Sequence, residues 1–417
     1  MTKIKLSDIT NNITDGKHGD CNNEGSSGYY FISVKDLGNY EIDYSNARQI
    51  TEKDFIETHK RTKLEIGDIL LANSGHTIGK IILVKDKPEV EFTTFQKSVA
   101  IIKPNRHKIK SEYLYFLLKA HKENLRKAAV GSAQPNLLLT DLRDFPVKIE
   151  PDCNKQESLV CSLKNIEDKI ELNNKINVRL EAMAKLIYDY WFVQFDFPNE
   201  EGMPYKSSGG KMTWSEELKR DIPEGWEVKK LIEILDVGKD QVNPSDYLDV
   251  VFKYLSIPVF DVTESYGLEK GRDIGSNKFI VDESDICVSK LNPWFNRVYY
   301  PLGNEKLICT TEMVVWKTQK DHFKNFFYEL ATSKHFIDYC TQSATGTSNS
   351  HKRVNPTVMM QYKLPFQKEI IENYGKQVNS VLLKIMKNKN ENRKLSGLRD
   401  WLLPMLMNGQ VNVGPSK

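Results

Sequence analysis

Two stretches decide the fold of this chain: residues 159–187, LVCSLKNIEDKIELNNKINVRLEAMAKLI, and residues 374–402, YGKQVNSVLLKIMKNKNENRKLSGLRDWL. Both lack proline, and in both the apolar side chains recur at alternating intervals of four and three residues. This spacing is the seam of a coiled coil. The two seams are displaced by a constant 215 positions, since 374 − 159 = 215 and 402 − 187 = 215. A repeat of this kind predicts two homologous halves, each a globular domain followed by a long helix.

The polar interruptions of the two seams repeat as well, because Asn173 matches Asn388 and Asn177 matches Asn392 at the same displacement. Each helix follows its own domain, so we expect the two helices to pack antiparallel. The asparagines would then meet near the pseudo-twofold centre. A polar residue at a seam position sets the register of a coiled coil at some cost in stability. The alternative is that these asparagines form a solvated patch.

Composition bounds the class of protein. The chain has 417 residues, of which 40% are hydrophobic and 28% charged, as in a globular protein of two or three domains. The sequence has no apolar run long enough to cross a membrane and no signal-peptide pattern at its start. The six cysteines are scattered without a C-x-x-C pair, which indicates a reducing cytoplasm. The net charge of +3 is compatible with nucleic acid as a partner but does not require it.

The sequence therefore predicts an α+β protein in which two pseudo-symmetric globular domains are joined by two long antiparallel coiled-coil helices. The expected segments are a first domain (1–150), a first long helix (151–195), a connector (196–225), a second domain (226–366), and a second long helix with its tail (367–417), the helix stopping near Pro404. The domains repeat more loosely than the helices. For example, residues 285–288 (DICV) correspond to residues 68–71 (DILL).

Two motifs approach those of enzymes. Residues 290–295 (KLNPWF) resemble the Asn-Pro-Pro-Tyr/Phe signature of adenine methyltransferases, but Trp294 replaces the second proline and no G-x-G element is present for a cofactor. Residues 75–80 (GHTIGK) are one residue short of a phosphate-binding loop. No His, Cys or carboxylate residues have metal-ligand spacing. We therefore expect no catalytic site, no cofactor site and no metal site on this chain.

The connector is the most distinctive stretch. It contains Phe195-Asp196-Phe197-Pro198, then residues 202–210 (GMPYKSSGG) and residues 222–226 (IPEGW). It resembles the specificity (S) subunit of type I restriction–modification enzymes. Further stretches carry the same resemblance: residues 179–181 (RLE), residues 189–192 (DYWF), the opening Asp15-Gly16-Lys17-His18, and Gly67–Leu70 with Gly79-Lys80. The resemblance covers essentially the whole chain. The segments that lead into the long helices, residues 150–156 and 363–369, differ from the usual Pro-Pro-Leu-x-Glu-Gln pattern of the family.

The resemblance implies two target recognition domains, each reading one half of a bipartite asymmetric DNA site. It implies a subunit without chemistry of its own, which docks two adenine methyltransferase (M) subunits and, in some complexes, restriction (R) subunits. S-adenosylmethionine, ATP and Mg²⁺ would then belong to those partner subunits. The helices would act as a ruler, because their length sets the distance between the two half-sites.

DNA contacts require donors and acceptors on loops for the bases, and cations or small hydroxyls for the phosphates. On this basis the expected DNA-binding residues of the first domain are Lys17, His18, Ser74, His76, Thr77, Lys97, Ser132, Gln134 and Asn136. Gln134 and Asn136 could pair with adenine through two hydrogen bonds, or could instead cap the following helix.

In the second domain the expected DNA-binding residues are Lys290, Asn292, Asn296, Arg297, Thr345, Ser348, Asn349, His351, Lys352 and Arg353. Residues 345–353 form a hydroxyl-rich and then basic loop that occupies the same repeat position as residues 131–136. A charge run is more often only a solvated surface, but this repeat position favours a DNA contact.

Two other classes of function fit parts of the sequence. A fused enzyme that both recognises and methylates DNA would need a site for S-adenosylmethionine, which the sequence lacks. A coiled-coil adaptor whose two domains bind proteins would show no response to duplex DNA.

Overall fold

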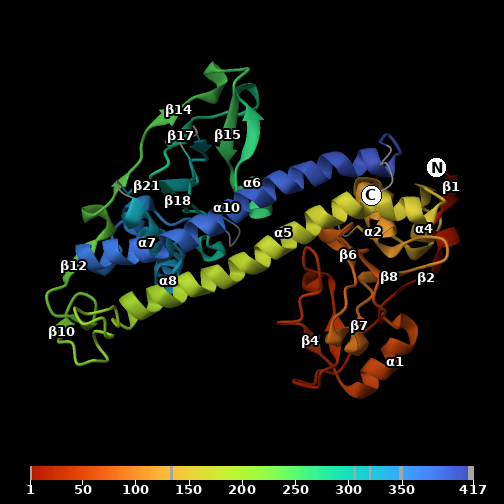
Figure 1. Cartoon of the computed structure of the whole chain (residues 1–417), viewed down its shortest axis with the longest axis horizontal. Helices are drawn as coiled ribbons and strands as arrows, with labels where there is room; N and C mark the ends of the chain where they lie inside the picture. The colour runs from red at the N-terminus through yellow and green to blue at the C-terminus, as the bar shows by residue number, and fades with distance from the viewer. Residues whose placement is uncertain (1, 132–134, 304–306, 319–320, 347–350, 412–417) are drawn as a thin grey trace. The chain divides into compact units, whose positions relative to one another are not determined.

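The computed structural model describes residues 2–131, 135–303, 307–318, 321–346 and 351–411 (Figure 1). It divides into two compact units: Met1–Glu171 with Leu395–Lys417, and Leu172–Lys394. We call these the first and second units. Each unit combines one globular domain with part of both long helices.

The first unit is built around a four-stranded antiparallel sheet in the order β2-β8-β5-β6. A three-stranded sheet, β4-β3-β7, lies beside it, with β3 parallel to β7. The strands are β1 (Thr2–Lys5), β2 (Thr10–Asp15), β3 (Tyr30–Ile32), β4 (Arg48–Gln49), β5 (Ile69–Ala72), β6 (Ile81–Leu83), β7 (Thr93–Phe95), β8 (Val99–Pro104) and β9 (Pro146–Ile149). The shorter helices are α1 (Glu52–Thr62), α2 (Ser111–Ala120), α3 (Lys122–Ala128) and α4 (Leu139–Arg143).

Strand β5 shows why this sheet forms the centre of the domain. Successive side chains of a strand point to opposite faces. Ile69 and Leu71 accordingly pack into one hydrophobic cluster, and Leu70 and Ala72 pack into another. All four side chains are fully buried, so the sheet is covered on both faces and the run is continuously apolar.

The second unit repeats this plan. Its four-stranded antiparallel sheet has the order β13-β21-β18-β19, and β16-β15-β20 repeats the three-stranded sheet, with β14 and β17 added beyond β20. The strands are β12 (Glu227–Lys230), β13 (Asp236–Val237), β14 (Gln241–Val242), β15 (Val251–Leu255), β16 (Gly267–Lys270), β17 (Lys278–Val281), β18 (Asp285–Ser289), β19 (Val298–Tyr299), β20 (Leu307–Cys309), β21 (Met313–Lys317) and β22 (Lys363–Phe366). The shorter helices are α6 (Ile257–Thr263), α7 (Asp321–Thr332), α8 (Lys334–Gln342) and α9 (Pro356–Met359).

In each domain the first and the last strand form an antiparallel pair. Strand β1 pairs with β9, from Thr2 with Ile149 to Lys5 with Pro146. Strand β12 pairs with β22 in the same way. The chain therefore enters and leaves each domain through neighbouring strands.

A buried carboxylate also repeats between the two sheets. Asp68, just before β5, binds Lys103 at 2.7 Å, and Asp285, at the start of β18, binds Lys317 at 2.8 Å. Burial raises the pKa of both aspartates against the opposing effect of their lysine partners. The correspondence of residues 68–71 with residues 285–288 is confirmed by the matching places of β5 and β18 in their sheets.

The two long helices are α5 (Cys153–Tyr188), which continues as a π-helical turn over Asp189–Val193, and α10 (Lys368–Met407). Within the second unit they run antiparallel, because Asn177 contacts Asn388 while Ala184, further along α5, accepts a hydrogen bond from Tyr374, which is earlier in α10. Pro404 lies inside the last turn of α10, which ends at Met407, so the helix stops near Pro404 as expected. Because proline has no backbone N–H, position 404 donates no intrahelical hydrogen bond to the carbonyl of Asp400.

The connector forms a small hairpin of β10 (Met212–Ser215) and β11 (Arg220–Pro223). Asp196 accepts hydrogen bonds from the backbone N–H and the hydroxyl of Ser207, at 2.7 and 2.6 Å. Phe197 stacks between Tyr205 and Trp226, at ring distances of 4.8 and 5.2 Å. The residues of this distinctive stretch therefore hold the connector together.

Candidate nucleic-acid interface

Loops from three strands meet at one end of the first four-stranded sheet. Strands β2 and β5 end at Asp15 and Ala72, and β8 begins beside them at Val99. The loops beyond these strand ends are joined by backbone hydrogen bonds, from Lys97 N–H to the Lys17 carbonyl (3.2 Å) and from Asn73 N–H to the Ser98 carbonyl (3.1 Å). This end of the sheet gathers six of the predicted DNA-binding residues: Lys17, His18, Ser74, His76, Thr77 and Lys97.

The segment after α3 joins the same end of the sheet. Gly75 N–H donates to the Pro135 carbonyl at 2.9 Å, and Leu137 N–H donates to the Asn73 carbonyl at 2.7 Å. Asn136 pairs its backbone with Val130 and is half-buried. It is therefore positioned beside Ser74, whereas Ser132 and Gln134 lie outside the described residues.

The second unit repeats this hydrogen-bond pattern with a displacement of 217 residues, since 292 − 75 = 217 and 352 − 135 = 217. Asn292 N–H donates to the Lys352 carbonyl at 2.7 Å, and Val354 N–H donates to the Lys290 carbonyl at 3.0 Å. The predicted residues Lys290, Asn292, Asn296, Arg297, Thr345, His351, Lys352 and Arg353 are gathered at this sheet end, and Ser348 and Asn349 lie outside the described residues.

The turns that leave β5 and β18 share a backbone conformation but not their side chains. Gly75 and Gly79 have φ angles of 74° and 83°, and Asn292 and Asn296, each 217 residues later, have φ angles of 45° and 49°. Glycine and asparagine are the residues that adopt this left-handed conformation most readily. Asn292 and Asn296 therefore have a conformational role, and their contact with DNA stays a prediction.

Several predicted residues present exposed side chains at these sheet ends. In the first unit these are His18, His76, Thr77 and Lys97, and in the second unit they are Asn296, Thr345 and His351. Other predicted residues are engaged within the protein. Asn292 is buried, and its side-chain oxygen accepts a hydrogen bond from the Lys352 backbone at 3.0 Å. Arg353 pairs with Glu312 at 2.9 Å.

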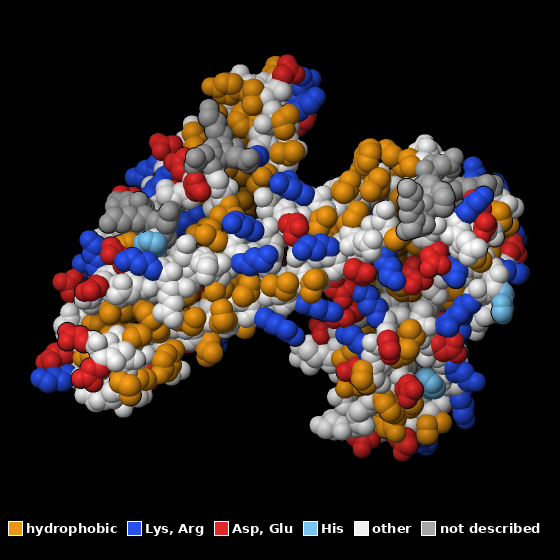
Figure 2. All heavy atoms as spheres, in the orientation of Figure 1, with side chains coloured by type: hydrophobic (Ala, Val, Ile, Leu, Met, Phe, Trp, Pro, Cys, Tyr) orange, Lys and Arg blue, Asp and Glu red, His pale blue; other side chains and the backbone are white. Residues whose placement is uncertain are grey.

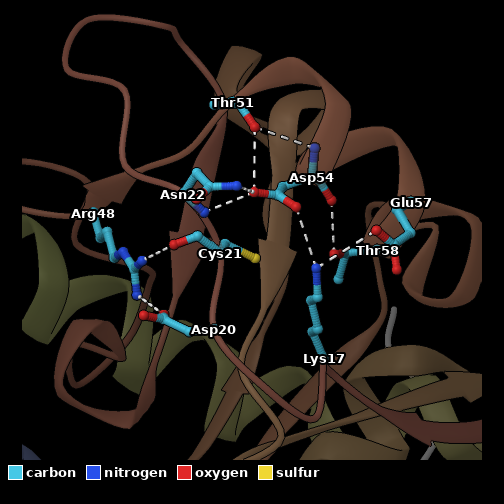
Figure 3. A network of polar contacts seen from close by, with 9 residues as sticks. All are labelled: Lys17, Asp20, Cys21, Asn22, Arg48, Thr51, Asp54, Glu57 and Thr58. Atoms are coloured by element: carbon cyan, nitrogen blue, oxygen red, sulfur yellow. Dashed lines mark hydrogen bonds and ion pairs between the residues drawn. The ribbon is translucent and has the colours of Figure 1, made fainter.

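Lys17 is tied to helix α1 instead of projecting into solvent. Figure 3 shows its ammonium group pointing to the carboxylates of Asp54 and Glu57, at 3.3 and 3.6 Å. Burial lowers the pKa of Lys17, but the hydrogen bond and the charge of Asp54 outweigh it and the pKa is raised. Asp54 also accepts hydrogen bonds from the backbone and side chain of Asn22, at 2.7 and 3.1 Å (Figure 3). This network fixes the loop after β2 against α1.

His18 is oriented by the buried carboxylate of Asp15. Its Nε2 lies 3.0 Å from Asp15, which also binds Arg61. With Nε2 held in this way, Nδ1 is the ring atom left to face a ligand. Gly16 between them has no room for a side chain, because a Cβ atom would lie 1.9 Å from the Phe95 carbonyl oxygen. The Asp-Gly-x-His motif therefore orients the His18 ring at the end of the sheet. Neither Asp54 nor Arg61 was singled out from the sequence, since both act across more than thirty residues of chain.

The asparagines of the helix seams meet within the second unit. Asn388 donates to the Asn177 side-chain oxygen at 2.8 Å, and Asn173 donates to Asn392 at 2.9 Å and to Glu391 at 2.8 Å. Asn173, Asn177 and Asn388 are buried, so a continuous solvated patch does not describe them. Their role in setting the register stays a prediction.

A further buried carboxyl group lies on α7. Glu329 is 6% exposed and lines a cavity of about 480 Å³ with Glu181, Lys185 and Asp189. Burial, followed by the charges of Glu181 and Asp189, raises its pKa to about 8, against the opposing charge of Lys185. Sequence patterns give no signal for such a group, because its environment is assembled from helices more than a hundred residues apart.

Within the described part of the chain, no group of three or more His, Cys, Asp or Glu residues could hold a metal ion. Over the same residues, no helix is long and apolar enough to cross a membrane.

Comparisons with known proteins agree with this architecture. Residues 1–182 match the family model described as the type I restriction modification DNA specificity domain. The chain is 28% identical to the type I restriction enzyme MjaIX specificity subunit of Methanocaldococcus jannaschii, over 92% of this chain and 87% of that protein. It is 22% identical to the type I restriction enzyme HindI specificity subunit of Haemophilus influenzae, over 98% of this chain and 99% of that protein.

Among solved structures, the S subunit of a type I restriction–modification system from M. genitalium has a similar fold. The TM-score is 0.58 at 15% identity, covering 97% of this chain and 96% of that one. This likeness confirms the expected fold class of two α+β domains with two long helices. Over 92% and 98% of its length, respectively, the chain is thus similar in sequence to two specificity subunits of type I restriction enzymes.

Proposed function

We propose that this chain is the DNA-reading subunit of a type I restriction–modification complex, and that each domain reads one half of a bipartite asymmetric site. The repeated hydrogen-bond pattern at the two sheet ends is the observation that carries the proposal. The two loops after β5 and β18 have one backbone conformation and different exposed side chains, such as His76 and Thr77 in one and Asn296 in the other. One backbone conformation that carries two different sets of exposed side chains suits a DNA site with two unlike halves.

The exposed groups are of the kinds that contact nucleic acids. Histidine, threonine and asparagine side chains donate and accept hydrogen bonds at base edges, and Lys97 is suited to a phosphate. In this proposal the two long helices act as a ruler, whose length would set the distance between the two half-sites. This geometry would determine the unread spacer, just as the symmetry of a dimer determines a palindromic site.

The partners in this proposal are double-stranded DNA, two methyltransferase subunits and, where present, restriction subunits. An exposed apolar stripe on α5 supports helix docking. Leu172, Met183 and Leu186 are exposed, and their spacing places them on one side of the helix, away from the seam. Figure 2 shows hydrophobic side chains exposed along this helix. Exposed apolar side chains grouped in this way are typical of protein–protein interfaces. Adenine methylation, with S-adenosylmethionine, and any cleavage, with ATP and Mg²⁺, would be performed by the partner subunits in the cytoplasm, and this chain would be non-catalytic.

The proposal is tested by mapping N6-methyladenine across the genome of cells that express this chain with the methyltransferase encoded beside it. A new split motif of two unlike half-sites with a constant spacer is the expected result. Methylation that does not depend on this chain, with a demonstrably active methyltransferase, would favour a protein-binding adaptor. Binding of S-adenosylmethionine by the isolated chain would favour a fused recognition and methylation enzyme.

A further inference from the structure

The turn between β18 and β19 presents two large aromatic side chains to solvent. Trp294 is 37% exposed and Phe295 is 58% exposed, and their ring centroids lie 5.9 Å apart. The corresponding positions of the first unit, 217 residues earlier, are Thr77 and the buried Ile78. The aromatic pair therefore belongs to the second domain alone, and it lies in the loop that gathers that domain's predicted DNA-binding residues.

The backbone beneath the aromatic pair is firmly held. Asn292 is buried and exchanges two hydrogen bonds with the Lys352 backbone, at 2.7 and 3.0 Å. Arg297, with a side chain only 9% exposed, pairs with Asp261 at 2.8 Å and lies 4.6 Å from the centre of the Phe295 ring. Pro293 further restricts the chain. Because the backbone that carries both rings is held before any ligand arrives, a contact made by them costs less conformational entropy than one made from an unheld loop.

The surroundings of the pair favour a nucleic acid over an apolar protein surface. Lys290 and Lys352 lie on the loops joined to this turn, and they form no ion pair with any described residue. Arg353 is beside them, paired with Glu312. Aromatic faces flanked by cations are how proteins stack on bases while neutralising phosphates, and apolar side chains also act as wedges between base steps.

We propose that Trp294 and Phe295 are specificity-determining residues of the second domain, which insert against a base step of its half-site and partly unstack it. This inference rests on the proposed function. Selectivity arises because the cost of unstacking depends on the base step, so flexible pyrimidine–purine steps are favoured. The first domain, with Thr77 at the corresponding position, reads its half-site without such a wedge.

The test uses the complete complex of this chain with its methyltransferase subunit and a duplex containing the motif found in the methylation map. We compare the wild type with the double variant Trp294→Ala/Phe295→Ala and with Trp294→Phe, which keeps an aromatic face. Trp214→Ala is the matched control, because Trp214 is 54% exposed in the connector hairpin of the same unit. Affinity is measured against salt concentration, and 2-aminopurine is placed in turn at each position of both half-sites.

The double variant is expected to lose roughly five- to a hundredfold in specific affinity, the range produced by loss of one aromatic–base contact. The salt dependence should not change, because no phosphate contact is removed. In the wild type and in Trp294→Phe, 2-aminopurine fluorescence should rise at one step of one half-site, and in the double variant this rise should disappear. Trp214→Ala should behave as the wild type.

Two results would overturn the inference while leaving the proposed function intact: unchanged affinity of the double variant with a sequence-specific wild type, or failure of the double variant to assemble with the methyltransferase. The second result would assign the aromatic pair to a protein contact. A wild-type complex that shows no sequence preference would instead overturn the proposed function itself.

Discussion

Replacing Glu329 by glutamine is expected to stabilise the second unit at alkaline pH and to have a much smaller effect near pH 5. Glutamine has the shape of a protonated glutamate but cannot ionise. In the native protein, burial and the nearby carboxylates of Glu181 and Asp189 raise the pKa of Glu329 from 4.5 to about 8, against the charge of Lys185. Between pH 4.5 and about pH 8 the folded protein therefore keeps a proton on Glu329 that the unfolded chain releases.

The size of the effect follows from proton linkage. Because the folded pKa lies above the unfolded one, the stability contributed by this group is fully present below pH 4.5 and is lost as the pH rises to about 8. The shift of 3.5 units (8 − 4.5 = 3.5), at about 1.36 kcal/mol per unit, amounts to about 5 kcal/mol. Roughly 1 kcal/mol of this is already lost at pH 5, so the substitution should gain about 4 kcal/mol more at pH 8.5 than at pH 5.

The measurement is urea unfolding of the wild type and of Glu329→Gln at pH 5 and at pH 8.5, with free energies of unfolding obtained by linear extrapolation. Glu201→Gln, at an exposed position of the same unit, controls for the loss of one charge. If the stability difference between Glu329→Gln and the wild type were the same at both pH values, Glu329 would not be held in its protonated form and the reasoning would be refuted.

Three further outcomes are expected. Asn388→Leu should destabilise the helix pair by about 1–3 kcal/mol in urea unfolding, because Asn177 loses its buried donor, and the double variant with Asn177→Leu should recover most of this loss. Gly16→Ala should reduce DNA affinity and lower the melting temperature of the first unit, because the added Cβ would collide with the Phe95 carbonyl. Lys97→Ala should weaken binding to all DNA sequences alike and reduce the slope of log affinity against log salt by about 0.9.

Each of these outcomes has a matched control and a contrary result. For the helix pair, equal losses in the single and double variants would exclude a coupled hydrogen bond. For Gly16, the control is Gly25→Ala, where a Cβ meets nothing within 4 Å, and equal effects would contradict the steric argument. For Lys97, the control is Lys148→Ala, an exposed position on β9, and an effect confined to one DNA sequence would exclude a phosphate contact.

The repeat in the sequence predicted the architecture because helix seams have a strict period. The repeat matched Asn173 with Asn388 and Asn177 with Asn392, and antiparallel packing predicted that these asparagines meet; the structure places Asn388 within 2.8 Å of Asn177. The added strands β14 and β17 could not be predicted in this way. Short strands at the edge of a sheet carry little periodic signal, and their pairing depends on partners distant in the chain.

The location of the candidate site could be predicted from the sequence, but the hydrogen bonds and ion pairs within it could not. Loop position and residue type led to Lys17 and Asn292, and both lie at the expected sheet ends. Their engagement with Asp54 and with the Lys352 backbone was not predictable, because those partners are 37 and 60 residues away in sequence. Local patterns identify which side chains are polar, whereas tertiary contacts decide which of them are left for a ligand.

The paired strands at the base of each domain have an evolutionary consequence. Because β1 lies beside β9 and β12 beside β22, the chain enters and leaves each domain at one place, and replacing the segment between Lys5 and Pro146 would leave both long helices continuous. Recombination within these strand pairs would replace the domain that reads one half-site and keep the domain that reads the other. A small stock of interchangeable modules would then generate many target combinations from one helical frame.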